Sequence, residues 1–251
     1  MAKTIDFNIV ADIYDSYVLA DFDIEFYQKL CKGHNKILEL MCGTGRVSIP
    51  LIKSGFDITC VDYSEKMLEA FKQKLTREHK AKILCQDVTR LNIGEKFSLV
   101  MIPFNSITEI NDKAKIQEAI KNVFDVLENN GTFLVTLYNP SYRKKQADGQ
   151  IKTLGKFSTN NGNTLLVSYY NNYDEKTDKV TGTQFYEIHD KNNKLIEKRF
   201  LDIAFVLISK QEIIEMCENA GFSLKEIYGD YSFNKFNEDS MFMNCVFCKN
   251  I

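Results

Sequence analysis

The chain has 251 residues, of which 44% are hydrophobic and 26% charged, and its formal net charge at pH 7 is -2. These values are ordinary for a globular protein, and the near balance of charges argues against a strongly basic binder of nucleic acid or of a membrane surface. The longest apolar run, Leu99–Phe104, is too short to span a bilayer. Because residues 1–6 lack the apolar stretch of a signal peptide, we expect a cytoplasmic protein with no membrane partner.

The chain contains seven cysteines, and Cys245 and Cys248 are the one close pair in the sequence. A Cys-x-x-Cys pair is used in redox and zinc motifs, but this one lies in an apolar, strand-like run with no second pair. Residues three apart in a strand also point to opposite faces of the sheet. We therefore expect reduced thiols and no metal site.

Predicted elements follow a regular order along the first half of the chain. Residues 1–35 carry apolar side chains at helical spacing, whereas from Lys36 onward short apolar runs alternate with amphipathic helical stretches. One such helix, Lys113–Asn129, has apolar residues three and four apart and stops at Asn129-Asn130-Gly131. This alternation predicts an α/β fold with a doubly wound, mostly parallel sheet and helices on both faces. The predicted strands are 37–40, 58–61, 82–85, 97–104 and 132–138.

Residues 141–207 break this alternation. Three strand-like runs, 165–170, 180–189 and 196–207, are separated by turn-rich segments. This pattern predicts an antiparallel β insertion after the fifth strand.

The chain returns to the first pattern after the insertion. A helix with a capping box of Ser209 and Glu212 ends at Gly221, and two strands, 223–227 and 241–247, follow it. We therefore predict one domain that is formed by residues 1–140 and 208–251 and contains residues 141–207 as an inserted module.

The segment with the clearest chemistry follows the first strand, at Glu39-Leu40-Met41-Cys42-Gly43-Thr44-Gly45-Arg46. Gly43 and Gly45 permit a tight turn and a close approach of a ligand, and the helix that follows offers free N–H groups at its start. The second strand ends in Asp62, an acid suited to binding the two hydroxyls of a ribose. A dinucleotide site requires a third glycine where this chain has Ser48, and Gly-x-Gly alone leaves the cofactor class open.

Four motifs in order make the chain resemble the class I S-adenosylmethionine (SAM)-dependent methyltransferases, over about residues 10–140 and 205–250. The resemblance implies a Rossmann-like, seven-stranded sheet and SAM as the cofactor. The motifs are Glu39-x-x-Cys42-Gly43-x-Gly45, Val61-Asp62-Tyr63-Ser64-x-x-Met67, Gln86-Asp87-Val88, and the run from Ser98 to Asn105.

The resemblance also implies roles for individual residues. Glu39 would anchor the loop and the methionine ammonium, Gly43 and Gly45 would let the methionine portion lie against the backbone, and Asp62 would accept from the ribose hydroxyls. The remaining cofactor contacts would be Tyr63 and Met67 near the adenine, Asp87 and Val88 at the adenine edge, Phe104 at the edge of the reaction centre, and Tyr14 as a cover over the cofactor.

A small molecule methylated on nitrogen or oxygen is the acceptor that the resemblance favours. Residues 102–106 differ from the Asn-Pro-Pro-Tyr motif of enzymes that methylate base amino groups, so a nucleic-acid substrate is disfavoured. The basic run Arg143-Lys144-Lys145 is either a solvated loop or a phosphate site. The insertion is similar to those of glycine N-methyltransferase-like and deoxysugar amino-methyltransferase-like enzymes, which help to form the substrate pocket or a dimer contact. Such an insertion makes a homodimer through residues 141–207 one expectation. The alternatives to a small-molecule methyltransferase are an RNA or protein methyltransferase and a SAM-binding protein without catalysis.

Several residues are candidates for contact with the acceptor. His189 is a possible base near neutral pH, although a single histidine before a turn is more often exposed, and Tyr14 is the second catalytic candidate. Arg46 either lies on the surface or faces a substrate carboxylate. Tyr138 and Asn139 end the fifth strand, at the edge where ligands bind in such sheets.

Overall fold

The computed structural model describes residues 5–76, 78–79 and 81–250. In this part of the chain, seven strands form sheet A in the order β10-β11-β5-β4-β1-β2-β3, and β11 runs antiparallel to both of its neighbours. The prediction of a doubly wound, mostly parallel sheet is thereby confirmed. The strands are β1 (Ile37–Leu40), β2 (Ile58–Asp62), β3 (Lys82–Cys85), β4 (Phe97–Ile102), β5 (Leu127–Tyr138), β10 (Phe222–Tyr228) and β11 (Phe242–Lys249).

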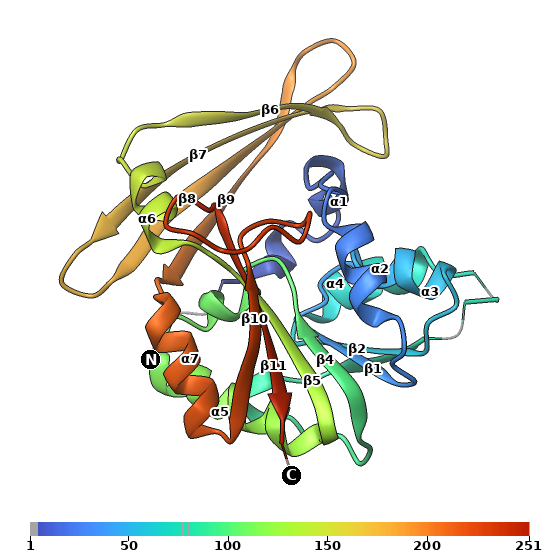
Figure 1. Ribbon diagram of the computed structural model, residues 1–251. Coiled ribbons are helices and arrows are strands. Elements are labelled where there is room, and N and C mark those ends of the chain that lie inside the picture. The colour runs from blue at the N-terminus through green and yellow to red at the C-terminus, as the bar shows by residue number, and fades with distance from the viewer. Residues whose placement is uncertain (1–4, 77, 80, 251) are drawn as a thin grey trace.

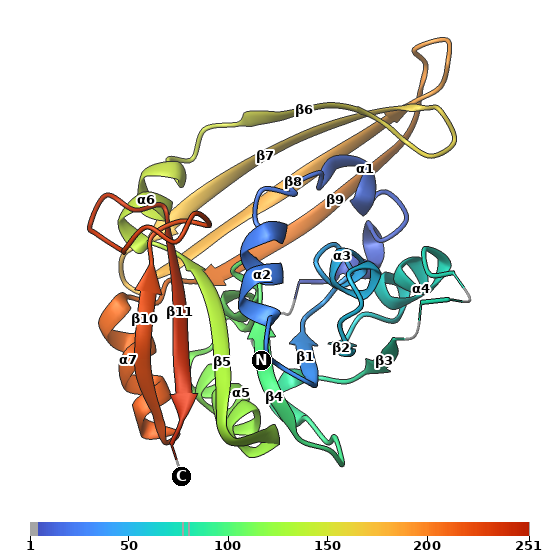
Figure 2. The same cartoon turned by 45° about the vertical axis from the view of Figure 1, so that its right-hand side comes forward.

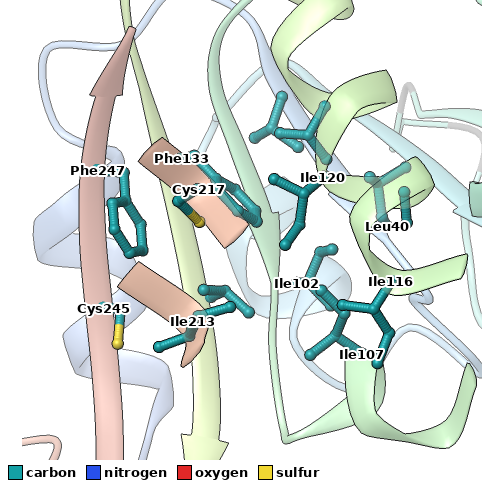
Figure 3. Packing of buried hydrophobic residues seen from close by; sticks show 14 of the residues in the cluster. Leu40, Ile102, Ile107, Ile116, Ile120, Phe133, Ile213, Cys217, Cys245 and Phe247 are labelled. Carbon is teal, nitrogen blue, oxygen red and sulfur yellow. The ribbon is translucent and has the colours of Figure 1, made fainter. Parts of the chain in front are cut away.

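Helices cover both faces of sheet A (Figure 1). The helices α5 (Lys113–Val126) and α7 (Lys210–Asn219) pack on one face, and α2 (Ile24–Cys31), α3 (Ser48–Lys53) and α4 (Glu65–Gln73) pack on the other. Figure 3 shows the first of these cores, in which side chains of α5 and α7 meet those of the central strands. The residues labelled there include Ile116 and Ile120 of α5, Ile213 and Cys217 of α7, and Phe133 and Phe247 of the sheet.

Local sequence sets the ends of the two long helices. Asp112 caps α5 by accepting from the backbone N–H groups of Ala114 and Lys115, and Ser209 and Glu212 form the predicted capping box of α7. However, α5 ends at Val126 and not at Asn129. Leu127 already pairs with Phe97 of β4, so β5 begins five residues before the predicted strand and contains a bulge.

The predicted antiparallel insertion is present as a second sheet, sheet B, which has four strands within the described residues. It lies across the carboxyl ends of the central strands of sheet A, beyond the short helix α6 (Pro140–Gln146) (Figure 2). Its first strand, β6 (Lys152–Ser158), is absent from the sequence prediction. The other strands are β7 (Thr164–Asp174), β8 (Lys179–His189) and β9 (Leu195–Val206).

The start of the chain packs against sheet B. Three short elements, η1 (Phe7–Ile9), α1 (Tyr14–Tyr17) and α2, replace the broad helical region that we predicted for residues 1–35. Val10, Ile13 and Tyr17 form an apolar cluster with residues of β7, β8 and β9. We based the expectation about a signal peptide on residues 1–6, and residues 1–4 lie outside the described residues. None of the helices that the structure describes has the length and apolar character needed to cross a membrane.

Candidate functional site

A cavity of about 380 Å³ lies between the carboxyl ends of sheet A, the segment around α1, and sheet B. The strand order of sheet A reverses between the neighbouring strands β1 and β4, and doubly wound folds bind ligands at the carboxyl ends of such strands. The cofactor end of the cavity is lined by Met41, Gly43, Asp62, Tyr63, Met67 and Phe104, and the end beneath sheet B by Tyr138, Arg143, Tyr169, Asn171, Gln184 and Phe205.

The two glycines of the first motif have different uses. Gly43 has a φ of +55°, lines the cavity, and donates its N–H to Asp62 Oδ2 at 2.8 Å. Gly45 has a φ of +82°, and a Cβ atom there would lie 2.5 Å from the ring of Phe71 on α4. Gly43 therefore shapes the ligand surface, whereas Gly45 allows the loop to pack against its neighbouring helix.

Asp62 is held in place by the backbone around it. Besides the bond from Gly43, its Oδ1 accepts the N–H of Ser64 at 2.8 Å. Burial raises the pKa of Asp62, and these backbone hydrogen bonds oppose that shift. Each carboxylate oxygen retains acceptor capacity toward the cavity that Asp62 lines, as required for binding two hydroxyl groups.

A smaller hollow of about 100 Å³ adjoins Asp62 and Tyr63. Asp87 and Val88 line this hollow, and Asp87 also caps the short helix η2 (Val88–Arg90) by accepting from Thr89 N at 2.8 Å. The hollow lies where the resemblance puts the adenine, next to the acid that would bind the ribose.

Glu39 lies beneath the glycine loop, with only 2% of its surface exposed. Ser48 Oγ donates to Glu39 Oε2 at 2.6 Å, and burial raises the pKa of Glu39 to about 8. Glu39 borders a third, small hollow together with Gly43, Tyr14 and Phe104. Glu39 thus supports the glycine loop directly and borders the hollow next to it.

Arg46 is neither a surface residue nor free to meet a substrate. Its two Nη atoms each bind a carboxylate oxygen of the buried Asp23 at 2.6 Å, and Nη1 also donates to the Ala20 carbonyl at 2.8 Å. The guanidinium carbon lies 4.3 Å from the centre of the Phe104 ring. Both alternatives from the sequence are therefore wrong: Arg46 ties the glycine loop to the start of α2.

The segment around α1 covers the cavity, and two of its contacts join it to the glycine loop and to sheet B. Thr44 Oγ1 donates to Asp15 Oδ1 at 2.6 Å, which joins α1 to the glycine loop. The hydroxyls of Tyr17 and Tyr186 lie 2.9 Å apart, which joins α1 to sheet B. Between these two contacts Tyr14 lines the cavity, and burial raises its pKa, so its hydroxyl is neutral and available as a hydrogen-bond donor.

The loop after β4 adopts an uncommon backbone at the edge of the cavity. Phe104 and Asn105 both have positive φ values, 59° and 63°, which non-glycine residues rarely adopt. Asn105 Oδ1 stabilises this turn by accepting from Tyr138 N at 3.0 Å. Tyr138 lines the cavity, whereas Asn139 turns away to cap α6 and to donate to the Glu238 and Ser240 carbonyls.

His189 is the one predicted catalytic residue that the structure does not bring to the cavity. Along β8, Gln184 lines the cavity and Tyr186 and Ile188 are buried beneath sheet B. His189 has the opposite parity and ends the strand, where its Nδ1 lies 3.3 Å from the Asn193 carbonyl. The strand register therefore directs its side chain to the face away from the cavity.

Sequence reasoning gave no role to the polar cavity residues Glu109, Asn171 and Gln184. It weighed Arg143 only within a basic run that is either a solvated loop or a phosphate site. Glu109 lies on η3 (Ser106–Ile110) and borders both the cavity and the smaller hollow, and burial raises its pKa to about 8. Arg143 follows the cap that Asn139 provides for α6. The basic run 143–145 was the one available signal, and it did not reveal that its first residue points inward.

Comparison with known proteins identifies similar methyltransferases. Residues 37–131 match the family model described as a methyltransferase domain. YqeM of Bacillus subtilis, a methyltransferase by name, is 27% identical over 233 residues, which cover 88% of each chain. The solved structures of the CcbJ methyltransferase from Streptomyces caelestis (TM-score 0.81, 20% identity, 96% of each chain) and of the sugar N-methyltransferase KedS8 from Streptoalloteichus (TM-score 0.76, 17% identity, 93% of this chain and 90% of that one) share its fold.

These matches decide between the two cofactor classes that the Gly-x-Gly pair left open. The matched methyltransferase domain and the fold shared with solved methyltransferases correspond to an enzyme that uses SAM. The protein is accordingly a SAM-dependent methyltransferase, and its chain resembles the class I enzymes.

Proposed function

We propose that the enzyme transfers a methyl group from SAM to a nitrogen or oxygen atom of a small molecule. The observation that carries this proposal is one continuous cavity of about 380 Å³, which the glycine loop lines at one end and the polar residues of sheet B line at the other. A roof formed by sheet B and α1 suits a small acceptor better than a folded macromolecule. The name of KedS8, a sugar N-methyltransferase, is consistent with nitrogen as the acceptor atom.

The cofactor would be held by residues of the glycine loop and the ends of β2 and β3. Asp62 would accept from the ribose hydroxyls, Gly43 would admit the methionine portion, and the hollow beside Asp87 and Val88 would take the adenine. SAM supplies an electrophilic methyl group on a sulfonium. The protein's share of the rate enhancement is then mainly alignment, for which proximity and orientation contribute on the order of 7–11 kcal/mol in favourable cases.

Glu109 is the residue that we propose as the proton acceptor for a nitrogen acceptor. An ammonium must lose a proton before its lone pair attacks. Burial raises the pKa of Glu109 to about 8, so the ionised form that accepts this proton increases as the pH rises toward 8. Tyr14 supplies a neutral hydroxyl to the same cavity, where it would orient the acceptor. In this proposal Glu109 takes the role that the sequence assigned to His189.

Three further expectations belong to this proposal. The inserted residues 141–207 form the acceptor end of the cavity, the enzyme works in the cytoplasm, and its substrate is not nucleic acid. The net charge of -2 supports the exclusion of nucleic acid, because a protein with this charge attracts a phosphate backbone only weakly.

Calorimetric titration with SAM, with its demethylated product S-adenosylhomocysteine (SAH) and with NAD tests the cofactor site. We expect the protein to bind SAM and SAH but not NAD, and Asp62→Ala to weaken SAM binding at least tenfold. Asp57→Ala is the matched control, since Asp57 lies just before β2, at the opposite end from Asp62, and is exposed. Binding of NAD alone, or an equal loss in both variants, would contradict this site.

A further inference from the structure

A partly buried arginine, Arg143, lies in the cavity wall beneath sheet B, and none of the ion pairs among the described residues gives it an acidic partner. The guanidinium carbon of Arg143 lies 5.6 Å from the ring centre of Tyr138 and 5.3 Å from that of Phe205. Its Nε is buried and has no hydrogen-bond partner. Arg46 and Arg199, by contrast, each hold a carboxylate.

This arrangement leaves a charge that the protein itself does not neutralise. Burial lowers the pKa of Arg143, but a guanidinium stays protonated in proteins. The two aromatic rings stabilise its faces, whereas the N–H groups lie along its edge and need acceptors of their own. A buried charge is costly unless it is paired, so the missing partner is expected to come from a ligand.

A second unsatisfied group lines the same cavity. Asn171, on β7, has 3% of its surface exposed, and its buried Oδ1 has no hydrogen-bond partner. The acids that line the cavity, Asp62 and Glu109, both border the smaller hollow at the cofactor end. The cavity is thus positive beneath sheet B and acidic near the cofactor.

We propose that the methyl acceptor carries an anionic group, a carboxylate or a phosphate, which the guanidinium of Arg143 binds beneath sheet B. Asn171 Oδ1 accepts a hydrogen bond from a donor on the same molecule, and the atom to be methylated lies toward Glu109. The planar fork of N–H groups matches the paired oxygens of either anion. This inference rests on the proposed function and adds the chemical class of the acceptor.

Side-chain NMR provides a direct test. In the ¹⁵N-labelled protein saturated with SAH, the Nε–Hε signal of Arg143 is assigned by its absence from Arg143→Lys. Inorganic phosphate and acetate are then titrated separately at constant ionic strength. We expect one of them to move the signal saturably, with a dissociation constant on the order of 1–10 mM, typical of so small a ligand. The anion that binds more tightly identifies the acceptor group as phosphate or carboxylate.

Lys144→Gln is the matched control, because Lys144 is next on α6 but its Nζ lies 3.5 Å from Asp178 Oδ1 in an exposed ion pair. In both variants anion binding is followed by the rise in melting temperature of the SAH complex. This rise should be unchanged in Lys144→Gln and absent in Arg143→Gln, which should still bind SAH. An Arg143 signal that neither anion moves at about 100 mM, or anion binding lost equally in both variants, would overturn the inference. The titration of the wild-type protein is informative even if Arg143→Gln folds poorly. A protein that fails to bind SAH contradicts the proposed function instead.

Discussion

Glu39 illustrates how a single residue under the site can influence the whole protein. The end of β1 places a carboxyl group in the core beneath the glycine loop, where Ser48 is its hydrogen-bond donor. Burial favours the protonated form and raises the pKa to about 8. The position was visible in the sequence because it ends a predicted strand, but its burial was not.

The raised pKa of Glu39 makes the stability of the ligand-free protein pH-dependent. In the unfolded chain this group ionises near pH 4.5, whereas in the folded protein it stays protonated up to about pH 8. Its stabilising contribution is therefore complete below pH 4.5 and declines as the pH rises to 8, by up to about 1.4 kcal/mol per pH unit. We expect urea unfolding between pH 5 and pH 8 to show a smaller loss of stability for Glu39→Gln than for the wild type.

The control for this prediction is Glu25→Gln. Glu25 pairs with Lys29 on the surface, and 77% of its side chain is exposed. This variant should retain the pH dependence of the wild type. If Glu39→Gln also retains it, Glu39 is ionised in the folded protein.

Among the secondary-structure elements, the sequence predicted those whose pattern is local. The strands of sheet A and the helices α5 and α7 have apolar periodicities and caps that are visible without tertiary contacts. The strand β6 was missed because Lys152–Ser158 contains Gly155 and alternates weakly, and its strand conformation depends on pairing with β7. The early start of β5 likewise depends on its pairing with β4.

The same distinction applies to the candidate site. Gly43 and Asp62 were identified because chain order alone puts the ends of parallel strands at one edge of a sheet. Arg143 and Asn171 come together only because sheet B folds over that edge. The sequence also does not reveal which face of β8 is turned inward, and this is why His189 stayed a catalytic candidate beside the expectation that it is exposed.

The link between α1 and sheet B is a testable property of these two elements. Tyr17 and Tyr186 share a buried hydrogen bond at 2.9 Å, so removal of either hydroxyl leaves the other with one partner fewer. We expect Tyr17→Phe and Tyr186→Phe each to destabilise the protein by about 1 kcal/mol. In denaturant unfolding, the stability lost by the double variant should be smaller than the sum of the two single losses by about 0.5–1 kcal/mol.

Tyr173→Phe provides the comparison for this cycle. The Tyr173 hydroxyl donates to Asp178 at 2.7 Å, away from α1, although Tyr173 also lies in β7 of sheet B. Its combination with Tyr17→Phe should therefore be additive. Additivity in the Tyr17/Tyr186 pair as well would mean that the two hydroxyls do not couple α1 to the sheet.

At the scale of the whole molecule, sheet B has two faces with different surroundings. Its inner face closes the cavity, and its outer face carries an aromatic row that crosses three strands. The rings of Tyr170 and Phe185 lie 6.0 Å apart and those of Phe185 and Phe200 lie 5.7 Å apart, and Phe200 is 56% exposed. Tyr170 and Phe185 are partly exposed, and a row of aromatic residues that ends in an exposed phenylalanine favours contact with another protein surface.

We expect this outer face to be the homodimer contact that the insertion suggested. In a two-fold dimer the same patch meets itself, so a charge placed at Phe200 enters the interface twice. Sedimentation velocity should show a dimer for the wild type, and Phe200→Glu should raise its dissociation constant at least tenfold, because two buried like charges repel. Phe22→Glu is the control, since Phe22 is 58% exposed but packs beside Tyr231 and Phe242, away from sheet B. A monomeric wild type would contradict this dimer contact. Equal weakening of the dimer by both substitutions would also contradict it.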